Sequence, residues 1–153
     1  MPATKKTSKE SGKEAISKKL LNKNEKGFEK AELSKKEKLD AILDELKRTG
    51  GIAGSAIVSR DGLAIASDLG EKNVDTFAAM SAAMQGAAET AASELKQGSL
   101  KQIIVDADEG KIITISTGEE AILVILAKQG INLGLVLLEL GKAAGKIADI
   151  LGG

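Results

Sequence analysis

Apolar and polar residues follow one another along this chain in patterns that predict three helices and five short strands. Between residues 34 and 50, leucine and isoleucine recur every three or four positions, which is the spacing of one helix face. Ser34 and Glu37 have the spacing of a capping box, and two glycines follow the last apolar residue. We therefore expect a first helix that begins at Ser34 and ends before Gly50.

Two pairs of short β-type runs predict two hairpins. Asp61-Gly62 separates the first pair and Glu109-Gly110 the second, and such dipeptides supply the positive φ that tight turns need. A further apolar run after Glu120 predicts a fifth strand. The expected strands cover residues 54–59, 63–66, 102–106, 111–115 and 121–127.

Two longer segments, residues 74–97 and 133–151, have the periodicity of helices. The predicted order is therefore helix, strand, strand, helix, strand, strand, strand, helix. Because tight turns join neighbouring strands, the sheet should be mostly antiparallel. We expect an α/β domain with one five-stranded antiparallel sheet and helices on both of its faces.

The segment 74–97 separates into three faces when it is placed on a helical wheel at about 100° per residue. An apolar face is expected to lie against the sheet, and it consists of Phe77, Met80, Met84, Ala87, Ala88, Ala91 and Leu95. A polar face contains Ser81, Gln85, Glu89 and Lys96, with Ala78 and Ala92 among them. The third face has only small residues, namely Ala79, Ala82, Ala83, Gly86, Thr90 and Ser93.

Gly86 distinguishes the third face from an ordinary alanine-rich helix surface. Alanine is the best helix former, so alanines alone would need no further explanation. A glycine inside a helix costs about 1 kcal/mol relative to alanine, and close approach of a second backbone is the usual compensation. Since no other predicted element remains to cover this face, we expect it to meet the same face of a second copy around a two-fold axis.

The composition excludes many kinds of catalytic site. The chain of 153 residues has no histidine, cysteine, tryptophan or tyrosine. It therefore cannot form a disulfide, a thiolate metal site or a triad that contains histidine or cysteine. Residues 106–117, 141–146 and 50–54 match a calcium loop, a phosphate-binding loop and a dinucleotide fingerprint only in part. We expect no catalytic residue, no cofactor, no bound metal and no enzymatic activity.

Positive and negative charges balance over the whole chain, with 22 of each, but they are unevenly distributed. Residues 1–33 are rich in lysine and poor in apolar residues, so we expect a flexible tail there. Residues 34–153 are net acidic and should form one folded domain, which argues against a nucleic-acid partner. No apolar run approaches the roughly 20 residues of a membrane span, and no signal peptide is recognisable, so we expect a cytoplasmic protein.

Three stretches together resemble the roadblock/LC7 family, which includes dynein light chains and a prokaryotic regulator of the gliding-motility GTPase. They are the first helix with its hairpin up to Ser67, the small-residue helix with Met80 and Met84, and residues 121–140. The resemblance spans about residues 34–151 and implies the profilin-like sandwich of that family. The lysine-rich residues 1–33 lie outside it.

The resemblance also implies a homodimer, in which the middle helices pair and the third strands of two copies join edge to edge. On this sequence the third strand places Ile103 and Val105 at the junction. Family members bind small Ras-like GTPases, and the candidate contact residues here are Ser81, Gln85, Glu89, Lys96 and Arg60. No arginine lies on the middle helix, so the resemblance implies a scaffold or regulator that acts without an arginine finger.

Two other functions stay open at the level of the sequence. A structural adaptor could join larger assemblies as a dimer, with the lysine-rich tail as its docking arm. A small-molecule sensor is the other alternative, because similar α/β sheet folds enclose ligands. The scarcity of aromatic residues, which are limited to Phe28 and Phe77, argues against a ligand pocket.

Overall fold

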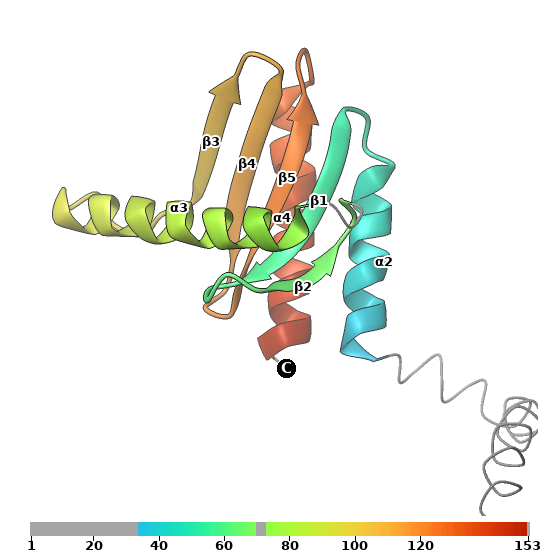
Figure 1. Cartoon of the computed structure of the whole chain (residues 1–153), viewed down its shortest axis with the longest axis horizontal. Coiled ribbons are helices and arrows are strands. Elements are labelled where there is room, and N and C mark those ends of the chain that lie inside the picture. The colour runs from blue at the N-terminus through green and yellow to red at the C-terminus, as the bar shows by residue number, and fades with distance from the viewer. Residues whose placement is uncertain (1–33, 70–72, 153) are drawn as a thin grey trace, which may run out of the picture. The chain divides into compact units, whose positions relative to one another are not determined.

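The computed structural model describes residues 34–69 and 73–152, and the elements of this part follow the predicted order (Figure 1). The helices are α2 (Lys35–Lys47), α3 (Val74–Glu94) and α4 (Leu133–Gly152). The strands are β1 (Ile52–Ser59), β2 (Ala64–Ser67), β3 (Gln102–Ala107), β4 (Gly110–Thr117) and β5 (Ala121–Lys128). The predicted tail, residues 1–33, lies outside the described residues.

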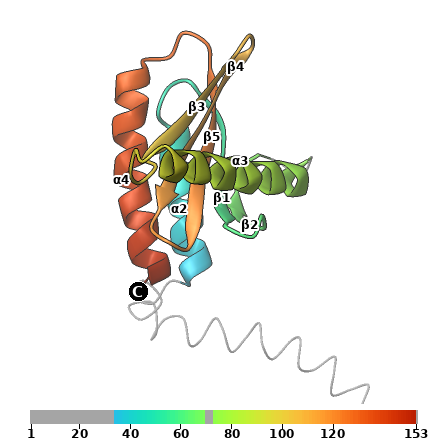
Figure 2. The same cartoon turned by 90° about the vertical axis from the view of Figure 1, so that its left-hand side faces the viewer.

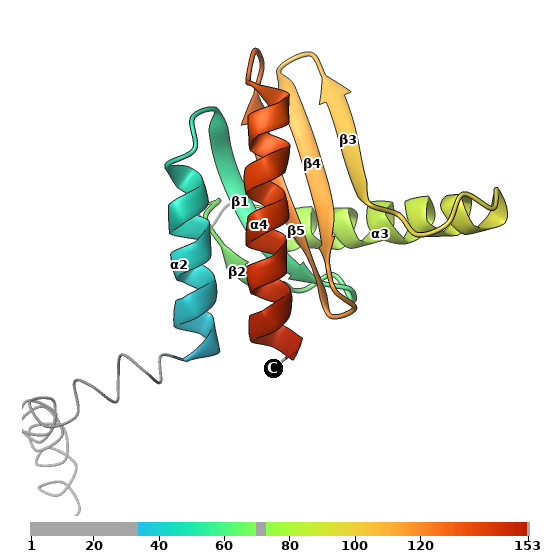
Figure 3. The same cartoon turned by 180° about the vertical axis from the view of Figure 1, so that it is seen from behind.

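All five strands form one antiparallel sheet in the order β2-β1-β5-β4-β3. Tight turns after β1, β3 and β4 pair consecutive strands, whereas α3 carries the chain from β2 at one edge to β3 at the other. Helices α2 and α4 lie side by side on one face, and α3 lies on the other (Figures 2 and 3). The predicted fold class is therefore confirmed.

The face of the sheet that α2 and α4 cover holds the main hydrophobic core. Alternate residues of the strands point to this face, because successive side chains of a strand point to opposite sides. They meet the apolar stripes that the periodicity predicts for the first and last helices. The fully buried side chains of this core include Leu39, Leu43, Ile57, Ile113, Leu123, Ile125, Leu140 and Ile147.

The opposite face is packed more thinly. Its buried apolar cluster consists of Ala56, Val58, Ala78, Ile122 and Val124, with Ala64, Leu69, Phe77 and Ile112 partly buried around it. α3 crosses the strands, and its C-terminal part extends past the β3 edge of the sheet (Figures 1 and 3). Only the N-terminal half of α3 therefore contributes to this small cluster.

The orientation of α3 differs from the prediction. The residues of α3 that are buried are Ala78, Ser81 and Gln85. The apolar face expected there is turned away by about a quarter of a turn, and Met80 and Leu95 are 66% and 69% exposed. The reason lies in β4, which presents the hydroxyl groups of Thr114 and Ser116 to α3. Buried hydroxyls need hydrogen-bond partners, so the polar side of the helix faces the sheet.

Candidate functional site

The contact between α3 and the sheet is built around a buried glutamine. Gln85 is 2% exposed. Its amide oxygen accepts a hydrogen bond from Thr114 Oγ1 at 3.1 Å, and its Nε2 donates to Ser116 Oγ at 3.0 Å. The same Nε2 donates to Glu89 Oε2, one helical turn further along, at 3.2 Å. These bonds satisfy the buried polar groups and hold α3 against β4.

Arg60 extends this network from the turn after β1. Its Nη1 donates to both carboxylate oxygens of Glu89, at 2.8 and 2.6 Å, and its Nη2 lies 3.3 Å from Ser116 Oγ. In the β4–β5 turn, the carbonyl oxygens of Gly118 and Glu119 accept bonds from Nη2 at 3.2 Å and from Nε at 3.1 Å. The bonds from Arg60 hold the pKa of Glu89 below its usual value, against a partial desolvation that raises it. One arginine thus ties α3 to β4 and to two turns.

These contacts contradict part of the predicted GTPase-contact surface. Ser81 is 3% exposed and Gln85 is 2% exposed, so neither is available to a partner protein, and the prediction is wrong for both. Glu89 and Arg60 are each about one-third exposed and are paired with one another. Lys96 follows the C-terminus of α3 and is exposed. The reason is that the polar side of α3 faces the hydroxyl groups of β4 instead of solvent.

The predicted small-residue face is divided by the β1–β2 turn. Gly62 has a φ of +89°, and a Cβ there would lie 3.2 Å from Ala79 Cα and 3.7 Å from Ala82 Cβ. Small residues at these two positions therefore let the turn approach the backbone of α3. The turn therefore approaches this face at half-buried Ala82, where the expectation that no other element covers it is wrong, whereas Ala79 stays exposed.

The other members of that face have no such neighbour among the described residues. They are all exposed, and we call them the small stripe of α3: Ala83, Gly86, Thr90 and Ser93. A Cβ at Gly86 would meet no atom within 4 Å beyond its own stretch of helix. The described chain by itself therefore offers no packing reason for a glycine in the middle of α3.

Strand β3 forms one edge of the sheet. Ile103 and Val105, the residues predicted for the dimer junction, pair with Thr114 and Ile112 of β4 and so point to the α3 side. Both are half-buried, whereas Ile104 points to the other side and is 38% exposed. Apolar side chains thus follow an edge that no other described strand covers.

The α3 side of the sheet also has an open hollow of about 310 Å³. Its lining comes from β1, β5 and the hairpin of β3 and β4, and is largely small or apolar. The residues include Ala53, Ala107, Gly110, Ile112 and Leu126. Together with Met80, this hollow shows that apolar surface stays uncovered on the side of the sheet where α3 lies.

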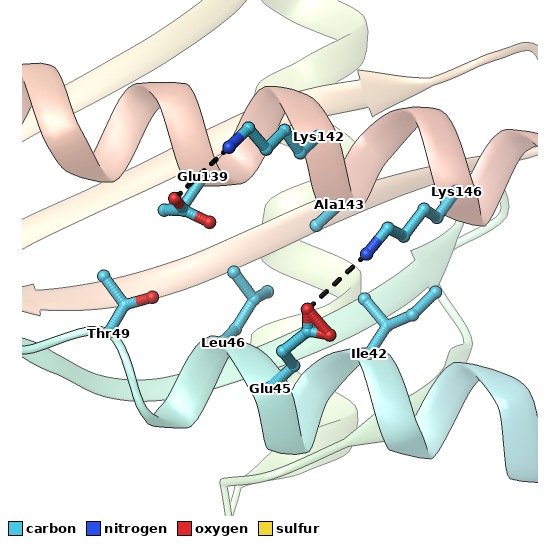
Figure 4. A pocket seen from close by; sticks show the side chains of 8 residues that line it. All are labelled: Ile42, Glu45, Leu46, Thr49, Glu139, Lys142, Ala143 and Lys146. Carbon is cyan, nitrogen blue, oxygen red and sulfur yellow. Dashed lines mark hydrogen bonds and ion pairs between the residues drawn. The ribbon is translucent and has the colours of Figure 1, made fainter.

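A second hollow of about 220 Å³ lies between α2 and α4 (Figure 4). Two ion pairs border it, with Glu45 and Lys146 at 3.5 Å and Glu139 and Lys142 at 3.7 Å. Its charged groups therefore bind one another instead of converging on a ligand. Neither hollow combines an enclosed apolar space with convergent polar groups, so neither favours the small-molecule sensor.

Within residues 34–69 and 73–152, no three acidic side chains come together in a way that could hold a metal ion. No helix of the same ranges is long and apolar enough to cross a membrane.

Sequence reasoning missed the hydroxyl groups that hold α3. In the second half of β4, Thr114 and Ser116 alternate with Ile113 and Ile115, so the side chains there are hydroxyl-bearing on one side and apolar on the other. Helices were expected on both faces of the sheet. The alternation in β4 was therefore the signal that one helix turns its polar side inward.

The sequence and the fold of this chain are similar to those of known proteins. Residues 38–127 match the Roadblock/LC7 domain family. Two uncharacterized proteins of Methanocaldococcus jannaschii are each 42% identical over 110 residues, which cover 71% of this chain and 96% of either relative. Myxococcus xanthus MglB has a TM-score of 0.71 at 20% identity, over 76% of this chain and 90% of its own. A Roadblock/LC7 domain from Streptomyces avermitilis has a TM-score of 0.71 at 19% identity, over 74% of this chain and 98% of its own.

Proposed function

The chain belongs to the Roadblock/LC7 domain family, and from this premise we propose that it is a homodimeric scaffold that binds a small Ras-like GTPase. The observation that carries the proposal is the exposed small stripe of α3 with Gly86 at its centre. The protein acts by binding the GTPase and modulating it, and it supplies no catalytic group to the hydrolysis of GTP.

The small stripe favours a second helix as its neighbour. A mid-helix glycine costs about 1 kcal/mol relative to alanine, so an exposed Gly86 calls for a compensating contact. The distance between two packed helices depends on the side chains between them, and small residues allow the backbones to approach. In a two-fold dimer the stripe of one copy meets the stripe of the other, so a single set of residues is sufficient.

The edge of the sheet supports the same arrangement. α3 extends past β3, so its C-terminal part projects beyond this edge (Figure 1). With the β3 edge of a second copy beside the first, each α3 covers apolar sheet surface of the other copy, including Ile103 and Val105. The two edge strands also satisfy one another's backbone groups, which removes the aggregation risk of a free edge.

The paired α3 helices form the surface that we propose for the GTPase. Met80 is 66% exposed and Lys96 is exposed, so they replace the buried Ser81 and Gln85 as contact residues. Arg60 is unsuited to act as an arginine finger, because its three guanidinium nitrogens are all bonded within the chain. An effect on hydrolysis then comes from reordering the GTPase's own residues.

A glycine-to-leucine exchange tests the dimer. Gly86→Leu adds bulk to the small stripe, and the monomer has room for it. Gly145→Leu is the matched control, because Gly145 is also exposed, lies within a helix and has open space around it. In light scattering, we expect wild type and Gly145→Leu to have the mass of two chains and Gly86→Leu the mass of one. A Gly86→Leu protein that stays dimeric at micromolar concentration contradicts the small stripe as the interface.

Calorimetric titration against a panel of small Ras-like GTPases, loaded with GDP or a GTP analogue, tests the second part of the proposal. We expect Met80→Glu to abolish binding while the protein stays dimeric. Leu138→Glu is the control, because Leu138 is 57% exposed on α4, on the opposite face of the sheet. A wild type that binds no GTPase of the panel, or equal binding by the two variants, refutes this contact surface.

A further inference from the structure

The two halves of α3 are held to the sheet by different kinds of contact. Phe77 and Ala78 pack into the small apolar cluster with residues of β1 and β5. Beyond them, no described residue of α3 belongs to a buried apolar cluster. Hydrogen bonds through Gln85 and Glu89 hold the helix there instead. The second half of α3 is therefore oriented by polar groups.

Glu89 marks the end of the attached part of α3. Among the described residues, no side chain from Thr90 to Glu94 makes a hydrogen bond or ion pair, and all but Ala92 are exposed. The helix continues for a further turn and a half, about 7–8 Å at 1.5 Å per residue. Because this end has no bond of its own to the sheet, its direction follows from how Glu89 is held.

Arg60 holds Glu89 in place from several directions. The guanidinium binds both oxygens of Glu89 and is itself fixed by Ser116 and by the carbonyls of Gly118 and Glu119. Arg60 and Glu89 are 33% and 35% exposed, so the ion pair is shielded on part of its surface. Nη1 alone contacts both carboxylate oxygens, while Nε and Nη2 bond the β4–β5 turn and Ser116, so the guanidinium is fixed on several sides and holds the carboxylate in charge-assisted hydrogen bonds.

We propose that Arg60 is a positioning residue for self-association. Through Glu89 it sets the angle at which α3 leaves the sheet, and so it sets where the small stripe meets the second copy. The inference rests on the proposed homodimer. Arg60 itself does not belong to the small stripe, and its effect on association passes through the direction of α3.

A lysine at this position separates charge from geometry. Arginine has five donors in a planar fork, whereas the ammonium group of lysine is a single point on a flexible stem. Lysine therefore cannot reach the carboxylate of Glu89, a hydroxyl and two carbonyls at the same time. If Arg60 acts by position, Arg60→Lys should behave like Arg60→Met, although it keeps the charge.

Hydrogen exchange in a monomeric background tests the orientation of α3 without interference from the interface. The full chain with Gly86→Leu is compared with the same chain carrying Arg60→Met, Arg60→Lys or Lys146→Met. The last is the control, because it removes an ion pair with Glu45 on the opposite face. For both Arg60 variants we expect exchange of residues 85–94 to rise about tenfold, as after loss of a charge-assisted bond. Exchange in residues 74–81 and in α4 should not change.

Sedimentation of the same variants with Gly86 intact tests the link to association. We expect Arg60→Met and Arg60→Lys to raise the dissociation constant of the dimer by about tenfold or more, and Lys146→Met to leave it unchanged. Unchanged exchange in residues 85–94, or an unchanged dissociation constant, overturns the positioning role. Equally faster exchange in all helices also overturns it, since Arg60 would then stabilise the whole domain instead of orienting α3. A monomeric wild type refutes the homodimer itself, whereas a dimeric wild type with unaffected Arg60 variants refutes only the inference about Arg60.

Discussion

The two faces of the sheet differ in the size and polarity of the side chains that cover them. Under α2 and α4, large aliphatic side chains such as Leu43, Leu123 and Leu140 are completely buried. Under α3, the buried apolar residues are mostly alanine and valine, and Gln85 and Arg60 supply polar contacts. Since buried apolar area drives folding, the α2–α4 face supplies most of the stability, and α3 is held more weakly.

This difference indicates how one small domain can combine a stable fold with an association surface. A helix that is oriented by hydrogen bonds does not need its apolar residues for its own attachment. Met80 and Leu95 of α3 therefore stay exposed. The hollow lined by Ile112 and Leu126 adds uncovered apolar surface on the same face, and such surface is typical of an interaction site. The thinly packed face is thus the side from which we expect partners to approach.

The largest effect is expected on the α2–α4 face. Leu140→Ala removes a completely buried side chain and should lower the free energy of unfolding by about 2–5 kcal/mol. Leu138→Ala, on the same helix and 57% exposed, should change it by less than about 0.5 kcal/mol. Urea unfolding followed by circular dichroism measures both values. Equal losses in the two variants would mean that α4 does not pack as described, and the contrast between the faces would then fail.

A smaller loss is expected when the polar contact of α3 is removed. Gln85→Ala leaves the completely buried hydroxyl of Thr114 without its partner and should cost about 1–3 kcal/mol. The double variant Gln85→Leu with Thr114→Val replaces both groups by apolar ones and should recover most of this loss. Urea unfolding of both proteins decides the matter. If the double variant is as unstable as Gln85→Ala, the loss does not come from the unpaired hydroxyl of Thr114, and the α3 face does not depend on this hydrogen bond.

The elements and their order could be predicted from the sequence because their signals are local. Gly62, for example, follows Asp61 between two β-type runs and adopts a positive φ of +89°. Asp61 and the Glu109-Gly110 pair do not adopt the positive φ that the same pattern predicts, and yet both hairpins form where the dipeptides indicate. The buried faces of α2 and α4 could also be predicted, since both helices meet an apolar surface. Leu140 and Ile147 lie on the face of α4 that the periodicity assigns to the core.

The orientation of α3 and part of its surface could not be predicted in this way. A helical wheel identifies the apolar side of a helix, but it does not say whether the neighbouring surface is apolar. Here that surface carries Thr114 and Ser116, so Gln85 was wrongly placed in solvent. The contact of Gly62 with Ala79 joins two different elements, and no local pattern reports it. The small stripe, by contrast, was recognisable from Gly86 because mid-helix glycine is costly in any context.

A still smaller effect should separate two exposed glycines on opposite faces of the sheet. Gly86→Ala and Gly141→Ala each replace a mid-helix glycine with open space around it, and each should stabilise the monomer by roughly 0.5–1 kcal/mol. Only Gly86 lies in the proposed interface. The stability gained by Gly86→Ala should therefore be smaller at high protein concentration than at low concentration, whereas Gly141→Ala should gain the same stability at both. Thermal unfolding at two concentrations measures this, and identical behaviour of the two variants would remove Gly86 from the interface.

The smallest expected effect is on the pH dependence of stability. It distinguishes Glu89 on the α3 side from Asp106 on the edge strand. The pKa of Glu89 lies below its usual value because Arg60 hydrogen-bonds to it, and that of Asp106 because Lys111 does the same. A carboxyl whose pKa is lowered on folding contributes stability above its unfolded-state pKa. This contribution is lost as the pH falls through the folded-state value. Both groups should therefore weaken the fold only in acid.

The absence of histidine and cysteine makes this acid effect easy to isolate. No side chain with an ordinary pKa titrates between about pH 5.5 and 8, so the melting temperature should be nearly constant there and should fall below about pH 4.5. Glu89→Gln should slightly lower the constant melting temperature between about pH 5.5 and 8, and should make its decrease in acid less steep. Asp106→Asn should do less of both, because the Asp106 side chain is 68% exposed and its ion pair with Lys111 is screened by solvent. A larger effect of Asp106→Asn than of Glu89→Gln would mean that the Arg60 network contributes no more to the fold than an exposed surface pair.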